Sequence, residues 1–202
     1  DLIFENSASI CYVGRGSFNN CHSLAKISFP SPLYSIGNYA FNNCSSLIKV
    51  SFPSTLKSIG EYAFMNCSSL TRLSFDQCTS LRRIGRNAFD NCTSLVNVVF
   101  SSSITSIGQK AFIKCSSLNK IVLPSSLKRI RKQIIQSTSI EEIIIPSNVR
   151  IIDKDAFSEI KSLKKVSFES PSSLYCFRSN IFDRCTSLFE ITIPPSVKII
   201  QS

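Results

Sequence analysis

Short segments in which apolar and polar residues alternate return at regular distances along the chain. In one such segment Val50 and Phe52 are apolar, while Lys49 and Ser51 are polar. A period of two residues is the pattern of a half-buried β-strand, in which successive side chains point to opposite faces. Pro53 follows directly, and a proline in this place ends a strand and turns the chain. The pattern therefore predicts a short strand with an apolar inner face, closed by a turn.

This segment belongs to a longer unit that repeats through nearly the whole chain. Each unit reads Ile-Gly-x-x-Ala-Phe-x-x-Cys-x-Ser-Leu-x-x-Ile-x-Phe-Pro-Ser, with variations. One large apolar position recurs after 23, 23, 25, 23, 23, 22 and 25 residues, and it is occupied by Phe18, Phe41, Phe64, Phe89, Phe112, Ile135, Phe157 and Phe182. A fixed period between 20 and 29 residues is the range of leucine-rich repeats.

The rest of the unit predicts how one coil closes. Leu56 and Ile59 indicate a second short extended segment on the opposite face, and Gly60 allows a tight turn. Residues 61–67 can form one or two helical turns with Ala63 and Cys67 on one face. A single coil cannot bury its apolar side, but stacked coils can, so stability becomes a sum over neighbouring coils.

The predicted fold class is α/β, mostly β. We expect a leucine-rich-repeat solenoid with a parallel β-sheet on its concave face, short second strands and short helical turns. Residues 1–202 are predicted to form a single solenoid of about eight to nine repeats of 22–25 residues. Neither end carries an obvious polar cap, so we expect the solenoid to be a fragment of a longer array.

Two units depart from the pattern. The sixth unit is one residue short and lacks the glycine, the Ala-Phe pair and the cysteine, with these residues instead: Arg131, Ile134, Ile135 and Thr138. The seventh has Asp153 for the glycine and Ile160 for the cysteine. We expect the coil to be least regular around the sixth unit.

The repeated Gly-x-x-Ala-Phe-x-x-Cys-x-Ser-Leu-x-x-Ile-x-Phe-Pro-Ser motif resembles the BspA-like leucine-rich repeats of bacterial and protist surface proteins. The resemblance covers essentially the whole chain. It implies a parallel-stranded solenoid and, for many members, a role at the cell surface in adhesion to host or matrix molecules. It implies no catalytic residues.

The charge balance narrows the class of partner. The chain has 23 basic and 13 acidic residues, a net charge of +10. This excess attracts acidic partners such as sulfated or sialylated glycans, anionic lipid heads, nucleic acid or acidic proteins. No apolar run approaches the roughly 18–20 residues that span a membrane. No secretory signal is visible, because Asp1 opens the chain without a basic region and an apolar region.

One outward position of the first strand is the best candidate for binding. Along the array it holds Lys26, Lys49, Arg72, Asn97, Lys120, Glu142, Lys165 and Glu190. We predict a basic strip formed by Lys26, Lys49, Arg72, Lys120 and Lys165. Beside it, Val99, Val122 and Ile144 are predicted to form an apolar patch. The alternative is a solvated sheet face on which long lysine side chains only keep the protein soluble.

A second group of cations flanks the irregular sixth unit. It consists of Lys128, Arg129, Arg131 and Lys132. A run of this kind can contact an acidic surface, and the alternative is an exposed corner without a ligand.

The cysteines favour packing over chemistry. Six of the nine occupy one repeat position, which also accepts Thr138 and Ile160. A position that accepts isoleucine is an interior position, and a free cysteine commonly behaves as a small buried hydrophobe. We predict no metal site and no cofactor. Cys11, Cys78 and Cys176 fall outside this position, in units with longer loops, and are the better candidates for exposed thiols.

Three asparagines match the acceptor pattern for N-glycosylation: Asn43, Asn66 and Asn91. The favoured alternative is that these side chains bond to local backbone at a turn.

Catalysis is not supported. His22 is the single histidine, and no phosphate loop or dinucleotide fingerprint is present. The predicted function is a non-catalytic repeat domain at the cell surface or secreted, which binds a protein or an acidic glycan. Nucleic acid is disfavoured, because no aromatic stacking platform accompanies the cations. The alternative is a cytoplasmic scaffold that docks on an acidic partner such as a cytoskeletal assembly, which would suit the unpaired thiols.

Overall fold

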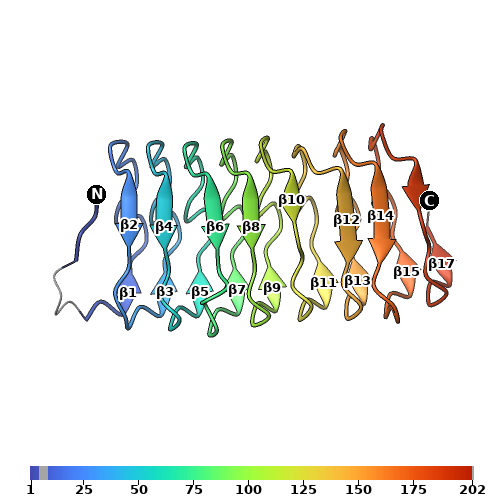
Figure 1. The fold of residues 1–202 in the computed structure, drawn as a ribbon, viewed down its shortest axis with the longest axis horizontal. Coiled ribbons are helices and arrows are strands. Elements are labelled where there is room, and N and C mark those ends of the chain that lie inside the picture. The colour runs from blue at the N-terminus through green and yellow to red at the C-terminus, as the bar shows by residue number, and fades with distance from the viewer. Residues whose placement is uncertain (5–8, 202) are drawn as a thin grey trace.

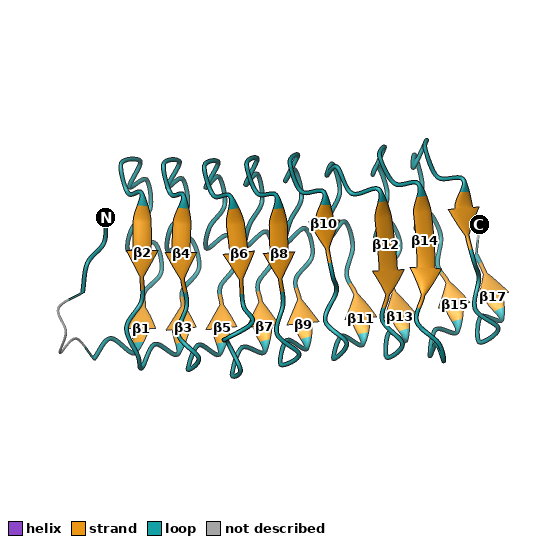
Figure 2. Ribbon diagram, viewed as in Figure 1, coloured by secondary structure: helices purple, strands orange, loops and turns teal. Residues whose placement is uncertain are grey.

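The chain winds into coils that stack side by side in one row, as a computed structural model of residues 1–4 and 9–201 shows (Figure 1). Each regular coil contributes one strand to each of two faces of the row (Figure 2). All the paired strands are parallel and join equivalent segments of successive coils. The predicted parallel-stranded solenoid is therefore confirmed.

The first face, called the long-strand face below, carries eight strands in the described residues. They are β2 (Lys26–Ser28), β4 (Lys49–Ser51), β6 (Arg72–Ser74), β8 (Asn97–Val99), β10 (Lys120–Ile121), β12 (Glu142–Ile145), β14 (Lys165–Phe168) and β16 (Glu190–Ile191). In β2, β4 and β6 the middle residue points inward and is buried, while the two flanking residues are exposed. This is the alternation that the sequence predicts.

The second face, the short-strand face, carries nine two-residue strands over residues 1–4 and 9–201. They are β1 (Tyr12–Val13), β3 (Ser35–Ile36), β5 (Ser58–Ile59), β7 (Arg83–Ile84), β9 (Ser106–Ile107), β11 (Arg129–Ile130), β13 (Ile151–Ile152), β15 (Cys176–Phe177) and β17 (Ile199–Ile200). These are the predicted second extended segments.

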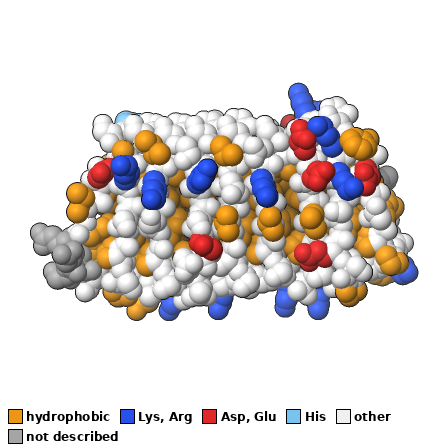
Figure 3. All heavy atoms as spheres, in the orientation of Figure 1, with side chains coloured by type: hydrophobic (Ala, Val, Ile, Leu, Met, Phe, Trp, Pro, Cys, Tyr) orange, Lys and Arg blue, Asp and Glu red, His pale blue; other side chains and the backbone are white. Residues whose placement is uncertain are grey.

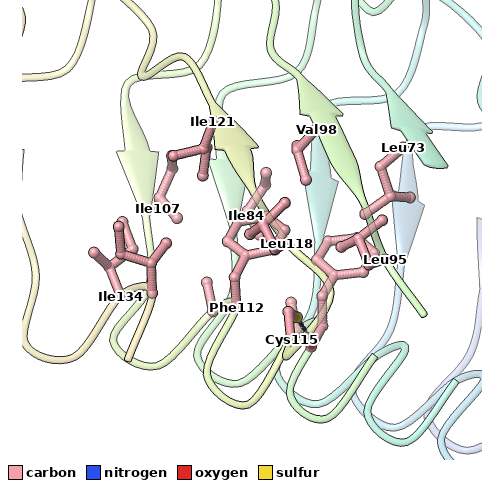
Figure 4. Close-up of a cluster of buried hydrophobic side chains, with 14 of the residues drawn as sticks. Leu73, Ile84, Leu95, Val98, Ile107, Phe112, Cys115, Leu118, Ile121 and Ile134 are labelled. Carbon is pink, nitrogen blue, oxygen red and sulfur yellow. Dashed lines mark hydrogen bonds between the residues drawn. The ribbon is translucent and has the colours of Figure 1, made fainter. Parts of the chain in front are cut away.

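The core is a set of side-chain ladders that run along the row. Phe64, Phe89 and Phe112 are fully buried and stack with ring centroids 5.3 Å apart. Stacked aromatic pairs contribute about 0.5–1.5 kcal/mol beyond the area they bury. Figure 4 shows side chains from both faces, among them Leu73 and Ile107, meeting in this core. Each coil is thus held by its neighbours, as expected for a solenoid.

The predicted helical turns are the one part of the fold that differs. Residues 61–66 form consecutive turns, and no helix is present in the described residues. Tyr62 and Asn66 have φ values of 58° and 60°, in the left-handed region, which interrupts a right-handed helix. Their N–H groups, and that of Phe64, donate instead to carbonyls of the next coil at 2.8–2.9 Å. Bonds between coils replace the bonds that a helix would make within one coil.

Candidate ligand-binding face

The predicted basic strip lies on the long-strand face. Lys26 and Lys49 are in register on β2 and β4, and Arg72 and Lys120 flank Asn97 in register on β6, β8 and β10. All four cationic side chains are exposed. Figure 3 shows this face with a row of blue side chains over its N-terminal half and mixed blue and red side chains near its C-terminal end.

Lys26, Lys49, Arg72 and Lys120 have no ionic partner within residues 1–4 and 9–201. All the ion pairs formed by the described residues lie between Arg129 and Glu190. Neighbouring strands lie about 4.8 Å apart, and like charges placed opposite each other at that spacing destabilise a sheet. Lys26 and Lys49 therefore repel each other, and no carboxylate of the described part of the chain forms an ion pair with either of them.

Lys165 differs from the other members of the predicted strip. Its ammonium lies 2.6 Å from the carboxylate of Glu190, which raises the pKa of Lys165, and Glu142 stands in register on the other side. The uncompensated strip therefore consists of Lys26, Lys49, Arg72 and Lys120.

The long-strand sheet is interrupted twice. Strand pairing joins β2 to β4, β6 to β8 and β10, and β12 to β14 and β16, with no pairing between β4 and β6 or between β10 and β12. Both interruptions coincide with grooves.

The first groove lies between β4 and β6 and has a volume of about 480 Å³. Lys49 and Arg72 stand on its two sides, and Asp76 follows β6 in the corner that two extra residues widen. The Ser74 hydroxyl donates a hydrogen bond to Asp76, and this bond lowers the pKa of the carboxyl. Asp76 is thus an anionic neighbour of a mostly basic groove.

The second groove, called the central groove below, lies between β10 and β12 and has a volume of about 660 Å³. Its apolar lining includes Val122, Leu123, Ile144 and Pro146, and its charged lining consists of Lys120, Glu141, Glu142 and Glu169. Val122 and Ile144 are 66% and 58% exposed. Two members of the predicted apolar patch thus line this groove, while the third, Val99, lies on the neighbouring strand β8 and is 41% exposed.

The central groove has a visible cause in the sequence. Two residues lie between Cys115 and Leu118, but only one lies between Thr138 and Ile140. The missing residue shortens the corner that leads into β12, so that β12 does not pair with β10. The acidic residues Glu141, Glu142 and Glu169 were not predicted as site residues; the 22-residue spacing is the signal that marks this place.

The second basic cluster lies at the other face, around β11. Arg129 pairs with Asp153 at 2.7 Å and Lys132 pairs with Asp155 at 2.9 Å. Lys128 and Arg131 are exposed. Carboxylates of the next coil thus compensate half of this cluster, which makes it a weaker candidate than the strip.

The repeated cysteines lie in the core, as predicted from their pattern. Cys67 and Cys92 are fully buried, and each thiol donates to a phenylalanine carbonyl of the preceding coil at 3.3 Å. The prediction for Cys78 is wrong: this residue is 1% exposed, and burial raises the pKa of its thiol to about 11. The wider corner turns Cys78 inward, whereas Cys11 and Cys176 are half-buried.

The three candidate glycosylation asparagines form a ladder. The side-chain amide of Asn66 donates to Asn43 at 2.7 Å, and that of Asn91 donates to Asn66 at 2.9 Å. Asn43 donates in turn to Asn20 at 2.8 Å. The predicted bonds to local backbone are therefore replaced by bonds between coils, which occupy the nitrogen that a glycan would modify.

The described residues show no assembled catalytic or metal site. His22 is exposed, and its ring makes no hydrogen bond to a serine in residues 1–4 and 9–201. The same part of the chain holds no group of three or more His, Cys, Asp or Glu placed to bind a metal. Nor does it hold a helix with the length and apolar character needed to cross a membrane.

The repeat geometry matches a known family. The family model of the BspA type leucine rich repeat region matches residues 3–83 and 82–202. The chain belongs to this family. BspA-type repeats thus account for both faces of the solenoid and for its ladders.

A solved structure of a leucine-rich repeat protein supports this fold. A leucine-rich repeat protein of T. pallidum is 29% identical, over 91% of this chain and 74% of that chain, with a TM-score of 0.65. A leucine rich cell surface protein of Faecalibacterium prausnitzii is 19% identical, over 99% and 86%, with a TM-score of 0.43. The pneumococcal vaccine antigen PcpA is 20% identical, over 89% and 63%, with a TM-score of 0.46. No curated protein matches the chain in sequence.

Proposed function

We propose that this BspA-type solenoid is a non-catalytic module that binds a protein or an acidic glycan through its long-strand face. The observation that carries the proposal is a row of four exposed cations that pair with no carboxylate of the described residues: Lys26, Lys49, Arg72 and Lys120. An acidic ligand would relieve the repulsion within this row. Complementary charge also speeds association and selects among partners.

The strip has small neighbours that leave room for a ligand. Ser28, Ser51 and Ser74 are the next outward residues on β2, β4 and β6, and all are exposed. A flat floor of serines lets an extended chain lie across the strands close to the ammonium and guanidinium groups. Exposed charges are screened within about 8–10 Å at physiological salt, so binding should weaken as salt is raised.

A triple variant with glutamate on the strip is expected to lose this binding: Lys26→Glu, Lys49→Glu and Arg72→Glu. The fold should be preserved, because all three side chains are exposed. Two probes are titrated by fluorescence anisotropy, a labelled hexaglutamate peptide and a labelled sulfated oligosaccharide. We expect affinity to fall by at least about tenfold for the probe that binds. Circular dichroism checks that the fold persists.

The matched control makes the same change of net charge elsewhere. Lys114, Lys154 and Lys161 are exposed and lie outside the strip. Their triple change to glutamate should leave most of the affinity. If both triple variants lose binding equally, overall charge and not the strip attracts the ligand; if the strip variant still binds as well, the strip has no part in binding.

We also propose that the module acts at the cell surface or is secreted, which the resemblance to surface-protein repeats supports. Protease added to intact source cells should then digest the solenoid, with a lysed sample as control. Protection until lysis would favour the cytoplasmic scaffold instead.

A further inference from the structure

We propose that the central groove is an anchor site for one apolar side chain of an acidic polypeptide, whose carboxylates lie on the basic strip. The inference rests on the proposed function and adds a partner class to it. It follows from the position of the groove beside Lys120, the last cation of the strip.

The groove has the size and chemistry of a side-chain pocket. Its volume of about 660 Å³ lies within the range of about 300–1,000 Å³ that is typical of ligand sites. Val122 and Ile144 present their apolar surface to solvent, and the buried Leu123 and Pro146 continue the lining inward. An aromatic or aliphatic side chain placed there would remove this surface from water, which is favourable in proportion to the area.

The walls of the groove are held in place from both sides. β10 pairs with β8, and β12 pairs with β14 over four residues. The groove is therefore flanked by a paired strand on each side, although Val122, Leu123 and Pro146 lie just beyond the strand ends. Because these residues are tied to paired strands, an anchor would enter a largely preformed site at a low cost in conformational entropy.

The charged residues around the groove determine on which side of it the acidic residues of the ligand can lie. Lys120 stands on the strip side, while Glu142 and Glu169 stand on the other. Glu141 is engaged by Lys164 at 2.9 Å, and Glu169 accepts the N–H of Ser147 at 3.0 Å. Glu142 has no ionic partner among the described residues. Acidic residues of the ligand would thus extend from the anchor towards β2 and not towards β12.

The distance from the groove to Lys26 sets how many residues the ligand needs between its apolar anchor and its last carboxylate. About four and a half strand spacings separate β2 from the groove, roughly 22 Å at about 4.8 Å per strand. An extended chain covers about 3.3–3.6 Å per residue, so roughly six or seven residues reach from the anchor to Lys26. A polypeptide meets both demands, whereas a sulfated glycan has carbohydrate oxygens where the anchor should be.

The test uses an amidated, labelled peptide of six glutamates, one serine and one phenylalanine, and a second peptide with alanine in place of the phenylalanine. Both are also made in reversed order, and the orientation that binds more tightly is used. With the unchanged protein, we expect the phenylalanine peptide to bind about tenfold more tightly than the alanine peptide. Val122→Ser with Ile144→Ser should reduce this ratio to below about twofold.

The control variant is Ile48→Ser with Val96→Ser. These two apolar side chains are 48% and 40% exposed, and neither lines the central groove. This control variant should leave the ratio unchanged, and an equal loss in both variants would contradict the anchor. The two peptides could instead bind equally well, with binding still lost when Lys26, Lys49 and Arg72 are changed to glutamate. That result would overturn the anchor but would still support binding by the basic strip. If both peptides bind the triple glutamate variant of the strip as tightly as the unchanged protein, the proposed function and the anchor are both overturned.

Discussion

Gly85→Ala is expected to destabilise the solenoid by more than about 3 kcal/mol, because the added methyl group has no room. An ideal Cβ at Gly85 would lie 2.5 Å from the carbonyl carbon of Gly60 and 2.6 Å from the nitrogen of Glu61. Both atoms belong to the backbone of the preceding coil and cannot rotate away. The two coils would have to separate at this corner, and the ladders on either side would lose contact.

The comparison that isolates this effect is Gly14→Ala. There the nearest atom to the added carbon is the side-chain oxygen of Ser17, at 3.2 Å, which can turn aside. Thermal unfolding followed by circular dichroism should show a large fall in midpoint for Gly85→Ala and little change for Gly14→Ala. A similar small change in both would mean that the coils are not as closely stacked as the structure has them.

Phe89→Ala should cost about 3–5 kcal/mol in the free energy of unfolding. Phe89 is fully buried, and its ring stacks between those of Phe64 and Phe112 at 5.3 Å on each side. Truncation removes the buried ring and leaves a cavity in the middle of the ladder, where the coils on both sides are fixed and cannot collapse into it.

Phe189→Ala deletes the same group of atoms from a side chain that is 76% exposed. Its free energy of unfolding should stay within about 0.5 kcal/mol of that of the unchanged protein. Urea unfolding of the three proteins measures both values. Equal effects of the two substitutions would contradict the stacking of Phe89 between Phe64 and Phe112.

Most of the architecture was predictable from the repeat alone. The alternation around Val50 places inward and outward residues, and the recurring position of Phe64 places the core, because every coil uses the same pattern. The basic strip could also be foreseen, since equivalent outward positions of parallel coils must align.

Other features depend on what stands next to a residue in the neighbouring coil. The segment 61–67 looks helical by its apolar spacing, but hydrogen bonds to the following coil hold Tyr62 and Asn66 in left-handed conformations. Asn43 bonds to asparagines one coil away and not to its own turn. Cys78 is buried because the widened corner folds inward.

Some features of the candidate site follow from the sequence, and others follow only from the tertiary structure. The sequence by itself determined that Lys26, Lys49, Arg72, Lys120 and Lys165 share one line, because the line follows from the period. Only the tertiary structure decided that Glu190 pairs with Lys165 and that the other four cations find no ionic partner in the part of the chain that is described. It also decided that the corner one residue short before β12 leaves the central groove open. The physical reason is that a period specifies which residues align, whereas pairing and packing depend on the side chains and backbone of two different coils in three dimensions.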